Sequence, residues 1–228
     1  MAARQVISMV GCACLIVTLD VASPLCADES YKVKNGFYIG GSWVQNGMSG
    51  DFDDTFYIIR PPDPDIYDVP DVDDGMGFGV FLGWRFIKGA LEIGYQRSTH
   101  DTSTSLGGMP DSDAAYNVVD LNLKVDVFHK FDVFAQHRLR PYVLVGFGVP
   151  WLTIEDGSTD GVSLYDETFV GYALNAGAGI AYYFDPQWAL TGGVIHRWNW
   201  FRNVESIKID GSVEERTLSF TVGLAYTF

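Results

Sequence analysis

Apolar and polar residues alternate one by one along much of this chain, and this period of two residues is its most constraining feature. Between residues 119 and 127 every odd position is Val or Leu, whereas the even positions are Asp, Asn or Lys. Successive side chains of a β-strand point to opposite faces, so such a segment has one apolar and one polar face. After residue 27 no segment shows an apolar period of 3.6 residues over the length of a helix. The sequence therefore predicts an all-β protein.

Eight segments of this kind follow one another, and most reach the 9–11 residues with which a tilted strand crosses a bilayer. We expect strands at about 35–46, 76–86, 90–98, 116–128, 140–151, 168–184, 187–200 and 214–228. Long connections, at 47–75, 99–115, 152–167 and 201–213, alternate with short ones at 87–89 and 185–186. An antiparallel up-and-down transmembrane barrel with long external loops and short turns at its other end has this layout. The connection at 129–139 is longer than the layout requires, and the strands beside it could extend into it.

The two faces of the expected strands differ in size as well as in polarity. One face carries large apolar side chains, and the other carries mostly Gly, Ala, Ser, Thr and Asn with a few charges. Small residues suit the narrow interior of an eight-stranded barrel, so we assign the large face to lipid. Charges inside must pair, because an unpaired buried charge is costly. The expected polar cluster of the lumen consists of Arg85, Glu92, Asp120, Asn122, Lys124, Asp126 and Arg197. Alternation places Arg97 with Tyr95 on the outer face.

The six tryptophans fall near the ends of the expected strands. They are Trp43, Trp84, Trp151, Trp188, Trp198 and Trp200. Tryptophan is enriched where a membrane meets water, so this placement predicts aromatic girdles at the two interfaces. The alternative is that these residues are scattered aromatics of a protein core.

The first 27 residues differ from the rest of the chain. Arg4 precedes an apolar run at 6–19, and Ala27 stands where a cut would follow. This is the layout of a secretory signal peptide, and the apolar run is too short to span a membrane as a helix. We therefore expect a signal peptide at 1–27 and one barrel domain at 28–228.

All three cysteines of the chain, Cys12, Cys14 and Cys26, lie in this leader. The mature domain would then have none, and it would need a source of stability other than disulfides. A closed barrel is such a source, because all of its backbone groups pair. The alternative is a lipoprotein in which Cys12 or Cys26 carries the lipid.

The formal net charge of −14 argues against nucleic acid as a partner, because phosphate binding needs a basic surface. Much of the acidity stands in the first long connection. Its acidic residues are Asp51, Asp53, Asp54, Asp63, Asp65, Asp68, Asp71, Asp73 and Asp74. Carboxylates bind calcium, but the spacing at 71–75 is not that of an EF-hand, so a solvated acidic loop is the simpler interpretation. Apolar residues at 56–59 and 66–67 interrupt the acids and could form a partner-binding surface, or they could be strand ends that extend above the membrane.

The last eight residues place a polar residue, a glycine, an aromatic residue and a terminal phenylalanine at fixed spacing. This segment resembles the β-signal that the barrel-assembly machinery reads in bacterial outer-membrane proteins. The residues that carry the resemblance are Thr221, Gly223, Tyr226 and Phe228.

Three further segments resemble strands of the OmpA-like and Opa-like outer-membrane β-barrel domain. Gly36-Phe-Tyr-Ile-Gly-Gly-Ser42 is similar to its first strand, Glu92 with Gly94-Tyr95 to its third, and 140–148 to its fifth. The resemblance spans about 34–228. It implies a monomer in the outer membrane of a Gram-negative-type bacterium, in contact with membrane lipid and lipopolysaccharide. The main non-membrane alternative is a lipocalin, which shares Gly41-Ser42-Trp43 but has its small residues on the other face.

Residues for catalysis or for a cofactor are sparse. Some eight-stranded barrels are lipid A deacylases or acyltransferases, but Trp198 stands where the motif around His196 would need a serine. Ser98 and His100 form another candidate pair, without a defined acid. The four histidines are far apart and the mature domain has no cysteine, so we expect neither a metal site nor a cofactor.

The functional prediction is therefore a non-catalytic barrel that acts in envelope integrity, adhesion or recognition through acidic external loops. The alternative is a narrow passive channel for small solutes or ions, because glycines on the luminal face could leave water inside. These are Gly77, Gly79, Gly83, Gly94, Gly146, Gly148, Gly177 and Gly179. A lipid A-modifying enzyme is the third candidate.

Overall fold

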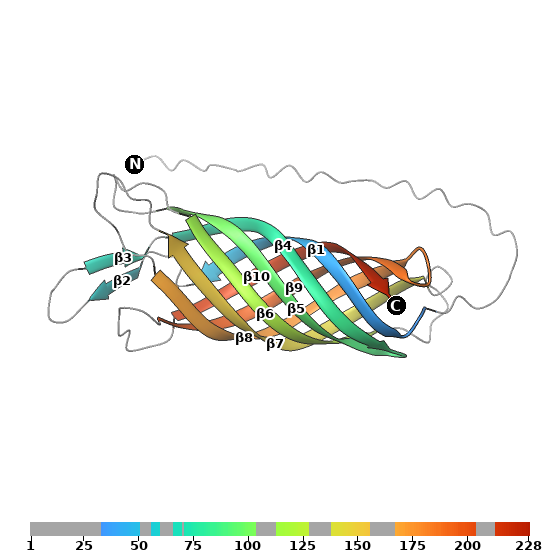
Figure 1. Cartoon of the computed structure of the whole chain (residues 1–228). Coiled ribbons are helices and arrows are strands. Elements are labelled where there is room, and N and C mark those ends of the chain that lie inside the picture. The colour runs from blue at the N-terminus through green and yellow to red at the C-terminus, as the bar shows by residue number, and fades with distance from the viewer. Residues whose placement is uncertain are drawn as a thin grey trace, which may run out of the picture.

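The chain folds into a closed antiparallel barrel of eight strands, with a small separate hairpin (Figure 1). A computed structural model describes residues 33–50, 56–59, 66–69, 71–103, 113–127, 138–155, 167–203 and 213–228. The barrel strands are β1 (Gly36–Gly50), β4 (Asp71–Phe86), β5 (Gly89–Ser103), β6 (Asp113–Asp126), β7 (Leu139–Glu155), β8 (Glu167–Tyr183), β9 (Trp188–Asn203) and β10 (Val213–Thr227). Each pairs with its neighbours along the chain, and β10 pairs with β1 to close the sheet. The predicted eight-stranded up-and-down barrel is confirmed.

The strands are staggered by ten residues around the barrel. Cross-strand partners lead from Ile39 through Leu82, Ile93, Leu121, Phe147, Leu174, Trp198 and Arg216 back to β1 at Ser49. A stagger of this size in eight strands corresponds to a tilt of roughly 35–45°, which is the oblique course of the strands in Figure 1. A barrel of this size has an interior that side chains can fill.

The barrel has two different ends, and its strands run further than predicted at one of them. The four long connections lie at what we call the outer end, and the short turns and the end of β10 lie at the inner end. β1 continues to Gly50, β4 begins at Asp71 and β5 continues to Ser103. The long connections are therefore shorter than predicted, at 51–70, 104–112, 156–166 and 204–212. Alternation fades in these extensions because the outward side chains become polar there.

Two connections depart from the prediction in other ways. The strands beside 129–139 barely extend into it, because β6 ends at Asp126 and β7 begins at Leu139, the last residue of that range. The acidic first connection contains paired strands, β2 (Phe56–Ile59) and β3 (Ile66–Val69), which form a sheet of their own rather than extensions of the barrel strands. This hairpin projects from the outer end of the barrel (Figure 1). Asp51, Asp53, Asp54, Asp63 and Asp65 lie outside the described residues.

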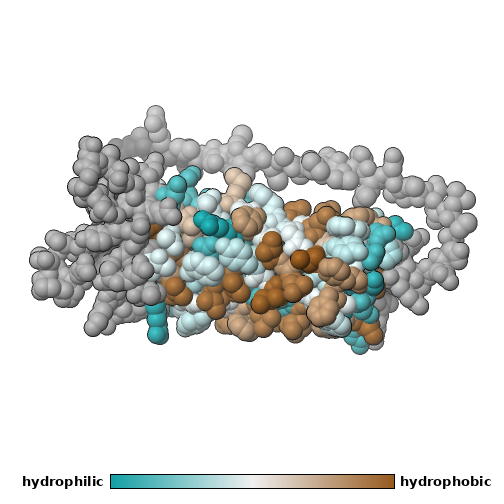
Figure 2. Space-filling view, viewed as in Figure 1, coloured by the Kyte–Doolittle hydropathy of each residue, from teal (hydrophilic) through white to brown (hydrophobic). Residues whose placement is uncertain are grey.

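Large apolar side chains cover the outer wall of the barrel (Figure 2). Leu82, Ile93, Phe147, Leu174 and Val222 are examples, each 46–55% exposed. Aromatic rings pair at both ends of this wall, Phe37 with Trp84 at the inner end and Tyr172 with Trp200 at the outer end. Trp43 departs from the predicted girdles, because β1 extends past it and leaves it in mid-strand. The part of the chain that the structure describes contains no helix that could cross a membrane.

Three aromatic rings fill the lumen at places where the opposite residue is glycine. The cross-strand pairs are Tyr38 with Gly83, Phe81 with Gly40, and Tyr142 with Gly179. A Cβ on any of these glycines would lie 2.3–2.5 Å from an atom of the partner side chain. Glycine is therefore required here because a ring occupies the space above it. The small luminal face makes room for rings as well as for water.

We predict that Gly40→Ala destabilises the barrel and that the neighbouring Gly41→Ala does not. A Cβ on Gly40 would lie 2.3 Å from the Phe81 ring and 2.6 Å from the backbone oxygen of Leu224, so ring and strand must both shift. Overpacking of this kind costs about 1–3 kcal/mol. On the outer wall, Gly41 has its nearest neighbour 3.6 Å away. The measurement for both variants is the free energy of unfolding in urea. Heat-modifiable gel migration reports the folded fraction at each urea concentration. Equal stability of the two variants would contradict this packing.

Candidate functional site: the lumen of the barrel

Charged side chains of opposite sign pair in layers across the lumen. At the inner end, Asp126 accepts hydrogen bonds from Arg85 at 3.4 Å and from Arg140 at 3.2 Å. The two guanidinium groups also lie over the ring of Tyr183, at 5.3 and 5.8 Å from its centroid. Two cations and an aromatic ring around one carboxylate thus fill the inner mouth of the barrel.

The next layer is centred on Glu92. Lys124 Nζ donates to Glu92 Oε2 at 2.7 Å, and the Tyr38 hydroxyl donates to the same oxygen at 2.8 Å. The ammonium also lies 5.4 Å from the centroid of the Phe81 ring and 5.0 Å from that of Tyr142. A desolvated cation is stabilised by aromatic faces at such distances. The rings that pack on glycine therefore also hold Lys124 in the lumen.

Arg197 crosses the middle of the lumen and is only 1% exposed. Its Nη2 donates to Asp120 Oδ2 at 2.7 Å and to Gln96 Oε1 at 2.9 Å. Its Nη1 donates to Ser219 Oγ, and Asn175 Nδ2 donates to Asp120 Oδ1 at 2.9 Å. A buried ion pair is tolerated when hydrogen bonds satisfy its remaining donors and acceptors. This network meets that condition and ties five strands together.

A chain of polar contacts leads from Arg197 toward the outer end. Asn46 accepts a hydrogen bond from Gln96 at 2.9 Å, and its amide donates to Ser98 Oγ at 2.7 Å. Ser98 Oγ lies 2.8 Å from His100 Nε2, and His100 Nδ1 lies 2.7 Å from the carbonyl oxygen of Asp73. The candidate pair Ser98 and His100 does meet, but both side chains are buried.

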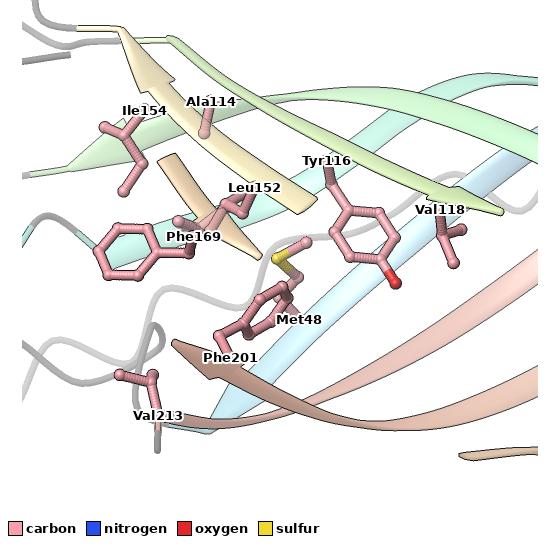
Figure 3. Packing of buried hydrophobic residues seen from close by; sticks show 10 residues of the cluster. Met48, Ala114, Tyr116, Val118, Leu152, Ile154, Phe169, Phe201 and Val213 are labelled. Atoms are coloured by element: carbon pink, nitrogen blue, oxygen red, sulfur yellow. The ribbon is translucent and has the colours of Figure 1, made fainter. Parts of the chain in front are cut away.

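Apolar side chains close the lumen above this polar chain. The outer apolar cluster comprises Met48, Val72, Ala114, Tyr116, Val118, Leu152, Ile154, Phe169, Phe201 and Val213. Met48, Phe169 and Phe201 point from three strands into the enclosed space (Figure 3). The Tyr116 hydroxyl donates to Asn199 Oδ1 at 3.3 Å and so joins the cluster to the polar lumen. The sequence does not reveal this cluster, because most of its members fall in segments that the pattern predicts as loops.

A cavity of about 60 Å³ remains between the Arg197 and Lys124 layers. Gly79 and Gly94 line it without a side chain, and Ser42 lines it with a short one. Charged groups of both layers also face it. A polar space of this size can hold a few water molecules. Water between the layers thus has room at Gly79 and Gly94, whereas rings fill the space beside Gly83 and Gly179.

All seven residues of the sequence-predicted polar cluster point into the lumen. Arg85, Glu92, Asp120, Asn122, Asp126 and Arg197 are 1–7% exposed, and the Lys124 side chain is 13% exposed. They form separate layers rather than one cluster, and Arg97 is exposed on the outer wall. The prediction left out Asn46, Gln96, Arg140 and Ser219, although alternation within their strands places them on the luminal face.

The four residues of the C-terminal signal lie on β10, the strand that closes the barrel. Thr221 and Gly223 face the lumen, whereas Tyr226 and Phe228 face outward. The Phe228 ring packs edge-on against Tyr226 with 5.3 Å between centroids. Its backbone nitrogen donates to the oxygen of Phe37 at 2.9 Å, so the chain end is fixed to the first strand.

The remaining candidate for catalysis, His196, lies on the outer wall. Its ring packs edge-on against Trp198, with 4.4 Å between centroids. Within the described ranges, no group of three or more His, Cys, Asp or Glu residues could hold a metal ion. His129 and His137 lie outside those ranges.

The sequence profile described as "Outer membrane protein beta-barrel domain" matches residues 14–228. The chain belongs to this family. No curated protein matches it. OprG from Pseudomonas aeruginosa has a TM-score of 0.57 and 13% identity, over 88% of this chain and 99% of that one. Neisserial surface protein A has a TM-score of 0.55 and 14% identity, over 85% and 98%. At these identities the likeness shows the fold alone.

The family and the apolar outer wall together show in which membrane the barrel lies. A wall of exposed large apolar side chains is stable only against lipid, and an eight-stranded barrel satisfies its backbone there. The chain is therefore a protein of the cell outer membrane, in contact with membrane lipid. The lipocalin alternative fails, because a lipocalin would have this wall in water.

We predict that Arg197→Met destabilises the barrel by roughly 3–5 kcal/mol, because Asp120 would remain as a buried unpaired charge. Arg97→Met, on the outer wall, is the control and should change stability by about 0.5 kcal/mol or less. Replacing both partners, Arg197→Met with Asp120→Leu, should recover part of the loss, since no charge is then orphaned. Unfolding in detergent micelles measures all three. A double variant less stable than Arg197→Met would contradict the pairing.

Proposed function

We propose that this barrel is a non-catalytic surface protein of the outer membrane, which acts in envelope integrity, adhesion or recognition through its outer connections. The observation that carries the proposal is the filled lumen. Charge layers occupy it from Asp126 to Arg197, and the outer apolar cluster covers it. A filled barrel is a rigid support, and binding residues of such scaffolds stand on the connections that the scaffold positions.

The arrangement of the connections supports this role. The four long connections share the outer end, where the β2–β3 hairpin also projects (Figure 1). The first connection and the strand ends beside it carry the acidic residues of 51–74. An acidic surface favours basic partners, or contact with lipopolysaccharide through shared divalent cations. We therefore place an extracellular partner at the outer end.

We also propose the route by which the chain reaches this membrane. Residues 1–27 would serve as a cleaved export signal, although they lie outside the described residues. The barrel-assembly machinery would then read Thr221, Gly223, Tyr226 and Phe228. Their position on the closing strand β10 supports this assignment.

Two observations support a role without catalysis. His100 Nδ1 contacts a backbone carbonyl oxygen, that of Asp73, rather than a carboxylate. Ser98 Oγ accepts a hydrogen bond from the Asn46 amide inside the lumen. A nucleophile in this position would need a path for substrate through the outer apolar cluster. His196 packs on Trp198 on the outer wall, and Trp198 occupies the position at which the deacylase motif would need a serine.

A passive channel is the second candidate, and the cavity of about 60 Å³ favours it. The cavity is bounded by the Arg197–Asp120 pair on one side and the Lys124–Glu92 pair on the other. A path for ions would require both pairs and the outer apolar cluster to part. Ion conduction therefore needs a conformational change that opens the lumen, whereas a barrel that only supports the outer connections does not.

Replacing residues 51–70 by a short Gly/Ser turn is predicted to leave the barrel folded and to reduce binding of expressing cells to extracellular matrix proteins. The replacement spares both barrel strands, because β1 ends at Gly50 and β4 begins at Asp71. The same replacement of 104–112 is the control. Unchanged binding at an equal surface level would count against the first connection.

In planar bilayers the purified barrel should show no discrete openings, because three charged layers and an apolar cluster lie in series along its lumen. Single-channel recording over a range of voltages is the measurement. Steady openings in the unaltered protein would favour the channel and overturn the support role.

A further inference from the structure

An open groove of about 290 Å³ lies on the wall of the barrel near its outer end, where β1, β10 and β9 are adjacent. Its lining residues are Ser49, Gly50, Trp198, Asn199, Trp200, Glu214, Glu215 and Arg216. Asn199 and Glu215 have buried side chains, so the side chains of the groove are those of the other residues. These remaining side chains belong to none of the charged layers of the lumen, and Trp198 and Trp200 are among the tryptophans of the predicted girdles.

The groove lies where the apolar wall ends. Along β10 the outward residues change from Glu214 and Arg216 to an unbroken apolar row. That row is Leu218, Phe220, Val222 and Leu224, each 40–53% exposed. The change from apolar to charged residues marks the interface between lipid tails and headgroups. The groove therefore faces the headgroups of the outer leaflet.

The hollow exists because β1 ends on small residues. Ser49 pairs with Arg216, and Gly50 pairs with Glu215. A Cβ on Gly50 would lie 2.6 Å from the backbone oxygen of Glu214, and its φ of +151° strains other residues. That Cβ would also lie 2.8 Å from Oε2 of the buried Glu215, so it would point to the lumen, and the short Ser49 is the side chain of β1 that borders the groove.

The opposite side is an aromatic wall with a charged floor. Trp198 pairs with Arg216, and Trp200 pairs with Glu214. Trp200 is stacked on Tyr172 at 5.2 Å, and Trp198 is 38% exposed. An indole face packs on the C–H face of a sugar ring while its edge stays in polar surroundings. A guanidinium binds phosphate oxygens through two parallel hydrogen bonds.

We propose that this groove binds the phosphorylated sugar headgroup of a glycolipid of the outer leaflet. Arg216 would bind a phosphate, Trp198 and Trp200 would pack on the sugar, and Glu214 would accept from its hydroxyl or amide groups. The acyl chains would follow the apolar row of β10 below, so the occupant reaches the groove laterally from the membrane. This site goes beyond the proposed function, because the outer connections take no part in it.

The test is native mass spectrometry of the full barrel, released from detergent after titration with three lipids. The probes are bisphosphorylated lipid A, its dephosphorylated form and phosphatidylglycerol. We expect bisphosphorylated lipid A to bind most tightly, and Arg216→Gln to weaken it about tenfold through the lost charge-assisted contact. Arg97→Gln, elsewhere on the outer wall, is the matched control and should bind as the unaltered protein does.

A second variant separates the shape of the groove from its charge. Ser49→Tyr would fill the groove and keep Arg216, so it should weaken both forms of lipid A. Heat-modifiable migration confirms that each variant is folded before titration. Equal affinities of Arg216→Gln and Arg97→Gln would overturn the proposal. So would phosphatidylglycerol bound as tightly as bisphosphorylated lipid A, since the lipid would then be ordinary boundary lipid.

Discussion

The pairing of β10 with β1 is the constraint on which the rest of this structure depends. Lipid offers no partner for an open strand edge, and each unpaired backbone group there costs several kcal/mol. The two strands pair without a break from Tyr38 with Thr227 to Gly50 with Glu215. Closing eight strands with this stagger also sets the width of the interior, so everything inside must fit a narrow tube.

That narrow tube explains the chemistry of the lumen. In the middle of the tube, the rings of Tyr38, Phe81 and Tyr142 each lie opposite a glycine, as Tyr38 does over Gly83. Charges fit only in pairs, because little water remains to solvate them. Arg197 shows the extent of the requirement, since its contacts reach β5, β6 and β10 from β9. A filled tube leaves the outer end and the lipid-facing wall as the surfaces on which a ligand can be bound.

Much of the fold could be predicted from alternation, because a period of two assigns each side chain to a face without knowledge of the partner strand. Arg197 and Asp120 were placed in the lumen on that basis. Their pairing could not be predicted, since 77 residues separate them and the stagger of the barrel decides which residues meet. The outer strand ends could not be predicted because the outward residues there are polar, as Glu214 and Arg216 are, and apolar residues such as Met48 and Phe201 face inward instead.

The hydrogen bonds of the lumen cross the seam between the first and last strands, and this has a consequence for assembly. Ser219 on β10 donates to Asn46 on β1, across 173 residues of sequence, and the same Ser219 binds Arg197. Until the last strand docks on β1, the contact between Ser219 and Asn46 is absent, and the lumen is open to water along the seam. The interior therefore dries in the final step of closure. A partly inserted chain is an open, hydrated sheet, and the barrel gains its polar core and its closed form together.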